Sequence, residues 1–249
     1  MANPPLANGR PEHIVRSYDD QLRRLRDQIV RMGGLVESQL RDCLAALSRR
    51  DLEAAERVIA TDPEVDAMER EIDATVIRLL ALRQPMAGDL RNTIAAMRIA
   101  ADLERAGDYA ANVAKRAIVV AALPSVPSVA GIARMLRMVL EAMKDVLDAY
   151  GADDAVKAVE VWSRDEAIDR VYTGLFREIL TYMMEDPRTI TACTHLMFMA
   201  KNIERVGDHA TNIAEIMHYA ITGQVLPGTR PKDDRSISGE TPPPEADGA

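Results

Sequence analysis

Two segments of the chain place acidic and amide side chains at matching intervals, and these side chains are the best candidates for chemistry. Each segment carries Glu, Asp and Asn at every fourth residue: Glu104, Asp108 and Asn112, then Glu204, Asp208 and Asn212. Four-residue spacing puts side chains on one helix face, where two like charges destabilise the helix by about 0.2–0.5 kcal/mol. The repeated Glu-x-x-x-Asp pair therefore predicts a compensating cation, either an arginine or a metal ion.

The two segments belong to an internal repeat. Seven of thirteen positions are identical between residues 102–114 and residues 202–214. Two unrelated segments of ordinary composition would share about one. The repeat predicts that one supersecondary unit is used twice, so the chemistry that it carries is expected twice as well. Gly107 and Gly207 also recur, and the missing side chain there allows a close approach by another helix or a ligand.

A hairpin about Pro85 supplies the residues that face the first acidic pair. Glu104 and Asp108 lie 19 and 23 residues after Pro85. If the flanking helices are antiparallel, these acids lie opposite the positions 19 and 23 residues before Pro85, which are Asp66 and Asp62. We therefore expect four carboxylates at one level of this hairpin.

The same construction about Pro187 gives a second quartet. Glu204 and Asp208 mirror positions 170 and 166, each one residue from an acid, Asp169 or Asp165. Paired inward carboxylates of this kind hold dinuclear or multinuclear iron, manganese or zinc in helix bundles, and hard oxygen ligands also suit magnesium. The two quartets are accordingly predicted to bind divalent or ferric metal ions.

The surroundings of the quartets leave two interpretations open. Four residues are candidate neighbours of the metal sites: Glu69 and Asp73, which continue the first acidic stripe, and Asn112 and Asn212. In the alternative, the acids lie on a solvated surface and bases neutralise them. The bases near them in sequence are Arg98, Arg105, Lys201 and Arg205.

No catalytic constellation accompanies the acids. A redox di-iron enzyme normally carries Glu-x-x-His on such helices, and that motif is missing. His209 follows Asp208, but Tyr109 takes the corresponding place in the first repeat. Phosphate-binding loops, nucleophile elbows and kinase signatures are also missing from the sequence. We predict a binding protein and not an enzyme, with a carboxylate-bridged multinuclear metalloenzyme as the alternative.

Apolar periodicity predicts an all-α fold of six long helices in two tandem three-helix bundles. The expected helices cover residues 11–48, 51–82, 86–121, 128–149, 153–184 and 187–221. Pro63 either kinks the second helix or begins a new helix after Asp62. Gly33 and Gly34 indicate a close helix crossing or a slight bend in the first helix.

These helices divide the chain into four parts. An N-terminal extension covers residues 1–12, the two three-helix repeats cover residues 13–124 and 125–223, and a tail covers residues 224–249. The tail is rich in Pro, Gly, Ser and acidic residues, and it cannot bury enough apolar surface to offset the entropy of ordering. We therefore expect it to be disordered.

The composition excludes several classes of protein. A net charge of −8 argues against binding to nucleic acid. Apolar runs stay well below the roughly 20 residues that a membrane span needs, and the N-terminus lacks an apolar signal region, so we expect a cytoplasmic protein. Cys43 and Cys193 stand alone in apolar helical patterns, which predicts two reduced core thiols.

Four motifs link the chain to a known family. They are Leu-Arg-Gln-Pro-Met-Ala-Gly-Asp-Leu-Arg at residues 82–91, Leu-Glu-Arg-Ala-Gly-Asp at 103–108, Leu-Thr-Tyr-Met-Met-Glu-Asp-Pro-Arg at 180–188, and Ile-Glu-Arg-Val-Gly-Asp-His-Ala-Thr-Asn-Ile-Ala at 203–214. Through them the chain closely resembles the PhoU family of phosphate-uptake regulators over residues 13–223. Ala106 departs from the branched residue that is commoner in the family, and this change leaves the carboxylates intact.

The resemblance implies two similar three-helix bundles, metal clusters on the acidic motifs, and a homodimer or higher homo-oligomer. It also implies an accessory role at the membrane without crossing it. There the family couples the ATPase of the phosphate ABC transporter to a sensor histidine kinase and holds the phosphate-starvation response off when phosphate is plentiful. We therefore expect a negative regulator of phosphate uptake and phosphate homeostasis that acts through two-component signalling.

Overall fold

The computed structural model describes residues 11–83 and 85–227, and this part of the chain is helical, without strands. Its elements are α1 (Pro11–Arg49), α2 (Leu52–Arg83), α3 (Ala87–Ala121), α4 (Val129–Ala152), α5 (Ala155–Ser163), α6 (Asp165–Glu185), the 3₁₀ turn η1 (Pro187–Thr189) and α7 (Ile190–Thr222). The predicted all-α fold is confirmed. The extension over 1–12 and the disordered tail were predicted mostly at positions 1–10 and 228–249, which lie outside the described residues. The exact domain boundaries stay a prediction.

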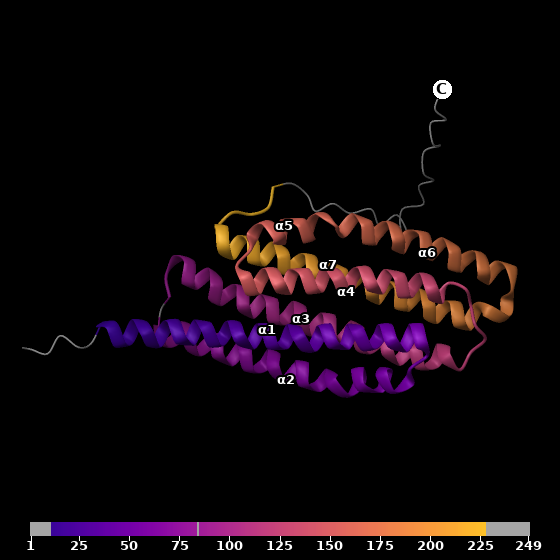
Figure 1. Ribbon diagram of the computed structural model, residues 1–249, viewed down its shortest axis with the longest axis horizontal. Helices are drawn as coiled ribbons and strands as arrows, with labels where there is room; N and C mark the ends of the chain where they lie inside the picture. The colour runs from indigo at the N-terminus through magenta and orange to yellow at the C-terminus, as the bar shows by residue number, and fades with distance from the viewer. Residues whose placement is uncertain (1–10, 84, 228–249) are drawn as a thin grey trace, which may run out of the picture.

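The helices form two groups that share one elongated body. Helices α1, α2 and α3 pack together, and α4 to α7 pack together, as the lower and upper parts of Figure 1 show. The most extensive contact between any two helices joins α3 to α7, and α1 also packs against α4. Both central helices bury alanines, among them Ala106, Ala110, Ala210 and Ala214, and such small side chains allow close helix packing. Within the described residues, we find no helix that is long and apolar enough to cross a membrane.

The fifth expected helix is divided at Arg164 into α5 and α6, so the prediction of one helix over residues 153–184 is wrong at that point. Asp154 caps α5, where its carboxylate accepts hydrogen bonds from the backbone N–H of Val156 and of Lys157, each at 3.0 Å. At the other end, the Ser163 hydroxyl donates to the carbonyl of Glu160, and a side-chain bond of this kind competes with helical pairing. The division makes Asp165 the first residue of α6.

Pro63 and Gly33 show how the first group departs from ideal helices. Helix α2 continues through Pro63, so the alternative of a new helix after Asp62 is wrong. Gly33 is buried where α1 crosses α4, because an added Cβ would overlap Leu147 Cδ2 and lie 3.2 Å from Leu147 Cγ. The close crossing predicted at the glycine pair is therefore confirmed, and Gly33 is the residue that makes it.

The two cysteines are free and buried, as predicted for core thiols. The Cys43 thiol donates to the carbonyl of Ala110 at 3.2 Å, and burial raises the pKa of this thiol. A neutral, buried thiol is a poor nucleophile, so Cys43 stabilises the first group of helices by packing.

Candidate metal centre

The α2–α3 hairpin brings the first carboxylates together. One oxygen from each of Asp66, Glu104 and Asp108 lies within 4.8 Å of the other two. Asp62 lies at the same level, because its Oδ1 is 3.8 Å from the place that a Cβ on Gly107 would occupy. Among the described residues, this is the one place where three acidic or histidine ligands converge so closely. We call these four acids the first cluster.

Crowding and burial perturb the first cluster. The pKa of Asp62 is raised first by burial and then by the charges of Asp108 and Asp66. Burial is also the largest cause of the raised pKa of Glu104, followed by Asp108, while Arg105 acts in the opposite direction. Burial is thus the first cause of both raised pKa values, and repulsion between neighbouring carboxylates is the second. A bound cation would relieve this repulsion.

The basic side chains near the first cluster offset its negative charge only weakly. Arg105 lies 3.6 Å from Glu104 and 3.8 Å from Asp108, and its side chain is 62% exposed. Arg98 makes no ion pair within the described part of the chain, although it lines a surface hollow of about 320 Å³ beside Glu104. Exposed pairs at these distances contribute at most about 1 kcal/mol. Arg70 adds a third exposed contact, 4.0 Å from Asp66, so exposed bases compensate the acids of this cluster only in part.

A third helix also contributes to the first cluster. Gln39 of α1 is 2% exposed, and its side chain forms a hydrogen bond that lowers the pKa of Asp62. Its Oε1 lies 3.1 Å from the Cβ position of Gly107 and has no hydrogen-bond donor among the described residues. A buried oxygen without a donor is costly, and a hard cation would satisfy it. The hairpin construction about Pro85 did not identify Gln39, because this residue lies on a different helix. The sequence does mark Gln39, since it is a polar residue at a position of the apolar stripe of α1.

The second cluster consists of Asp165 and Asp169 of α6 and Glu204 and Asp208 of α7. Asp165 and Asp169 are each 2% exposed and Glu204 is 4% exposed, so this cluster is more deeply buried than the first. Burial is the first cause of the raised pKa of Glu204, and the charges of Asp208 and Asp169 add to it. Asp169 and Asp208 thus lie close enough to act on Glu204, but no three described acids of this half converge as tightly as in the first cluster, so the second quartet stays a prediction.

One base does pair with the second cluster. The ammonium of Lys201 lies 3.0 Å from Glu204 Oε1 and 2.9 Å from Glu204 Oε2. The Thr211 hydroxyl donates to Asp165 at 3.1 Å. Arg205, by contrast, donates to the Tyr109 hydroxyl at 3.4 Å. The sequence-based alternative of basic pairing thus holds for Lys201 in this half.

The four candidate neighbours differ in position. Glu69 lies near the first cluster, since its charge raises the pKa of Glu104. Asp73 is half-buried one turn farther along α2, and Asn112 is exposed on α3. The Asn212 amide donates to Asp102 at 3.2 Å, across the contact between the two groups of helices. Of the four residues, Glu69 is therefore the best placed to extend a metal site.

Asp102 also contacts a histidine across the boundary between the two groups of helices. His209 Nδ1 lies 2.7 Å from Asp102 Oδ1, and the His209 ring stacks on Tyr109 with centroids 5.7 Å apart. This link between α3 and α7 was not anticipated from the sequence, because it depends on how the two repeats pack. It directs His209 towards the first half of the molecule and not into a shared ligand set.

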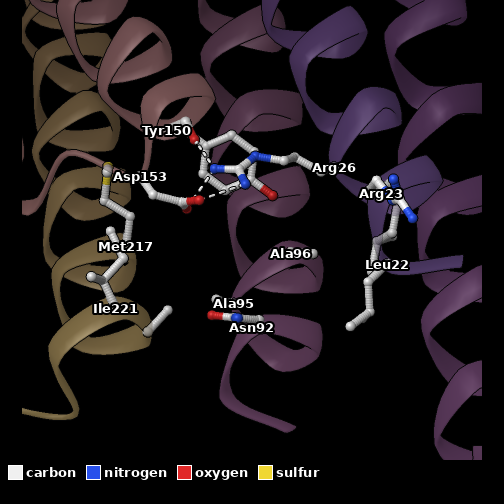
Figure 2. Close-up of a pocket in the computed structure, with 12 residues that line it drawn as sticks. Leu22, Arg23, Arg26, Asn92, Ala95, Ala96, Tyr150, Asp153, Met217 and Ile221 are labelled. Atoms are coloured by element: carbon white, nitrogen blue, oxygen red, sulfur yellow. Dashed lines mark hydrogen bonds and ion pairs between the residues drawn. The ribbon is translucent and has the colours of Figure 1, made fainter. Parts of the chain in front are cut away.

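A cavity between the two groups of helices lies apart from both clusters. It has a volume of about 160 Å³, and Figure 2 shows the Arg26 guanidinium directed at Asp153 and Tyr150 on its wall. Arg26 donates to Asp153 Oδ2 and to the Tyr150 carbonyl, each at 2.6 Å. Because its cation already has an anionic partner, this cavity is best explained as a structural joint between the two halves.

The fold and the clusters define a class: an all-helical protein of two similar units, each with an acidic cluster between two long helices. A family model described as the PhoU domain matches residues 29–117 and 132–217, one stretch in each half. Given this match and the relatives described next, the chain belongs to the PhoU family.

Relatives from several bacteria match most of the chain. A phosphate-specific transport system accessory protein PhoU homolog of Caulobacter vibrioides is 53% identical over 224 residues, which cover 90% of this chain and 97% of that protein. The phosphate-specific transport system accessory protein PhoU of Escherichia coli K12 is 37% identical over 213 residues, or 86% and 88% of the two chains. The crystal structure of PhoU from Pseudomonas aeruginosa matches with a TM-score of 0.81 and 38% identity, covering 83% of this chain and all of that one. The fold therefore agrees with an experimental structure of a relative.

Proposed function

We propose that this chain is a phosphate transport accessory protein and a negative regulator of the phosphate-starvation response. In this role it links the ATPase of the phosphate ABC transporter to a sensor histidine kinase. It keeps the kinase in its inhibitory state when phosphate is plentiful. The observation that carries the proposal is the 53% identity to an accessory protein of phosphate-specific transport over 90% of the chain. The coupling to the kinase goes beyond that name and follows the family resemblance.

The architecture suits a docking protein. Long helices that pack side by side present extended surfaces to other proteins. A regulator of this kind needs only different affinities for two states of its partner. We place the protein in the cytoplasm, peripheral to the membrane, as a homodimer or higher homo-oligomer.

We further propose that both clusters bind metal ions, with iron, manganese, magnesium or zinc as the candidates. The donors are hard carboxylate oxygens, and Gln39 Oε1 adds an unsatisfied oxygen in the first half. A bound ion would supply positive charge between two helices of each hairpin. In the first half, Asp62 and Asp66 of α2 and Glu104 and Asp108 of α3 would hold the ion.

A carboxylate-bridged metalloenzyme is the second candidate, and the convergence of Asp66, Glu104 and Asp108 favours it. Against it, the histidine that such redox sites require is missing from the cluster, because His209 contacts Asp102. Turnover of phosphate esters or consumption of oxygen by the metal-loaded protein would support the enzyme.

Deletion of the gene tests the regulatory proposal. In phosphate-rich medium, the deletion strain should express phosphate-starvation genes and take up excess phosphate, and a plasmid copy of the chain should restore repression. Silent starvation genes together with normal uptake in the deletion strain would contradict the proposal. A pull-down of the tagged chain at high and low phosphate should recover the kinase or the transporter ATPase.

A further inference from the structure

The second cluster contains a cation of its own, and the first lacks one at the equivalent position. The Lys201 ammonium contacts both oxygens of Glu204 and lies 4.9 Å from the centre of the Tyr172 ring. The Glu204 side chain is 5% exposed and that of Lys201 is 30% exposed, so solvent screens this ion pair only in part. The two repeats align with an offset of 100 residues, so Ala101, which is exposed, stands where Lys201 does.

A second difference lies on the facing helix. Glu69 follows Asp66 by three residues in α2, and Tyr172 follows Asp169 by three residues in α6. The first half thus gains a carboxylate that acts on Glu104. The second half has a buried aromatic ring at this place, and the ring packs against the Lys201 ammonium. The aromatic face stabilises a nearby cation and offers no metal ligand.

A third difference surrounds the repeated glycines. A Cβ on Gly107 would meet Gln39 Oε1 at 3.1 Å, whereas a Cβ on Gly207 would meet Val139 Cγ2 at 3.5 Å. Gln39 and Val139 are again 100 residues apart and occupy matching places in α1 and α4. The first half has an amide oxygen where the second half has a methyl group. Glu69 and Gln39 thus make the first cluster richer in oxygen donors, and Ala101 leaves it without the cation that Lys201 supplies in the second.

We propose that the two clusters are unequal metal sites: the first binds a metal ion directly, whereas Lys201 serves as a counter-cation in the second and must be displaced by an incoming ion. This inference rests on the proposed metal binding of both clusters. The ammonium and a divalent ion compete for the same Glu204 oxygens, and the ion must also compensate for the lost pairing of Lys201. Occupancy of the second half should therefore follow that of the first as the metal concentration rises.

Calorimetric titration of metal-free, full-length protein with manganese(II) chloride tests the order of binding. The double variant Glu204→Gln with Asp208→Asn disables the second cluster, so its titration gives the metal affinity of the first cluster. The double variant Glu104→Gln with Asp108→Asn gives the metal affinity of the second cluster in the same way. We expect the first cluster to bind manganese at least about tenfold more tightly. Elemental analysis after gel filtration counts the ions retained by each variant.

Two reciprocal substitutions test the role of Lys201. Lys201→Met retains the apolar stem beside Tyr172 and removes the charge, so the affinity of the second cluster should rise about tenfold or more while the first is unchanged. Ala101→Lys adds an ammonium beside the first cluster at an exposed position and should weaken that site. This second variant keeps the test decisive if the first folds poorly, and circular dichroism monitors folding of both.

The outcomes separate the two proposals. Equal affinities in the wild-type protein, or Lys201→Met and Ala101→Lys variants that bind manganese as the wild type does, would overturn the counter-cation inference and leave metal binding intact. If wild type and both lysine variants bind neither manganese nor iron, the proposed metal sites themselves are wrong.

Discussion

Gly33 and Gly34 are neighbours in α1, and exchanging each for alanine should affect stability differently. A Cβ on Gly33 would overlap Leu147 Cδ2 and lie 3.0 Å from Cδ1 and 3.2 Å from Cγ, whereas a Cβ on Gly34 would have no atom within 4 Å. An alanine at position 33 therefore requires the half-buried Leu147 side chain to change conformation, or α1 and α4 to separate.

The magnitude follows from two terms. Replacing glycine by alanine inside a helix stabilises by about 0.5–1 kcal/mol at either position. Overpacking costs about 1–3 kcal/mol and applies to Gly33 alone. Gly34→Ala should therefore raise the free energy of unfolding by about 0.5–1 kcal/mol. The free energy of unfolding of Gly33→Ala should be about 1–3 kcal/mol lower than that of Gly34→Ala, because the gain from replacing glycine inside a helix is common to both variants and cancels.

Urea unfolding followed by circular dichroism measures this difference. The double variant Gly33→Ala with Leu147→Ala should show favourable coupling, since truncating Leu147 removes the overlap. If Gly33→Ala is as stable as Gly34→Ala, or if the double-mutant cycle shows no coupling, the close crossing of α1 and α4 is not what makes glycine necessary at this position.

Two further predictions concern charge. The pKa of Glu104 is raised above 4.5, so the stability associated with its protonated form is complete below pH 4.5 and is lost as pH rises through the raised pKa. In metal-free protein, Glu104→Gln should therefore gain melting temperature relative to wild type as the pH rises from about 4 to 8, and a constant difference in calorimetry would contradict this. Arg26→Met removes the hydrogen bonds to Asp153 and to the Tyr150 carbonyl and should lower the free energy of unfolding by about 1–3 kcal/mol. Arg23→Met, which removes an exposed pair with Asp20, is the control; a similar loss would show that Arg26 has no special role in joining the halves.

Sequence patterns predicted the features that depend on neighbours within one hairpin. Apolar periodicity and the turn prolines located the long helices, and antiparallel pairing about Pro85 placed Asp66 beside Glu104. Such features need only helix geometry and a turn, both of which are local. The first cluster could therefore be assembled from residue numbers alone.

Features that depend on contacts between helices of different hairpins were not predictable in this way. The break at Arg164 accompanies an ion pair between that residue and Asp145 of α4, at 2.7 Å, and no apolar pattern encodes that pairing. Gln39 reaches the first cluster from α1, and Asp102 meets His209 only because α3 packs on α7. Each of these contacts requires the position of a helix outside the hairpin.

The pairing of Lys201 with Glu204 was only partly predictable from the sequence. The three-residue spacing on α7 permits the contact, but Lys201 could equally have pointed to solvent. The buried ring of Tyr172 on α6 favours the inward position, and that ring was not part of the sequence-based site.

The central proposal is that the carboxylate clusters support the proposed regulatory function, and a reporter of a phosphate-starvation promoter tests this proposal most directly. The chromosomal gene is replaced by the Glu104→Gln and Asp108→Asn variant, with Glu53→Gln and Glu56→Gln, two exposed acids of α2, as the matched control. In phosphate-rich medium, the account predicts reporter expression near the level of the deletion strain for the cluster variant and wild-type repression for the control, at equal protein levels. Full repression by a cluster variant that retains no metal would contradict the account.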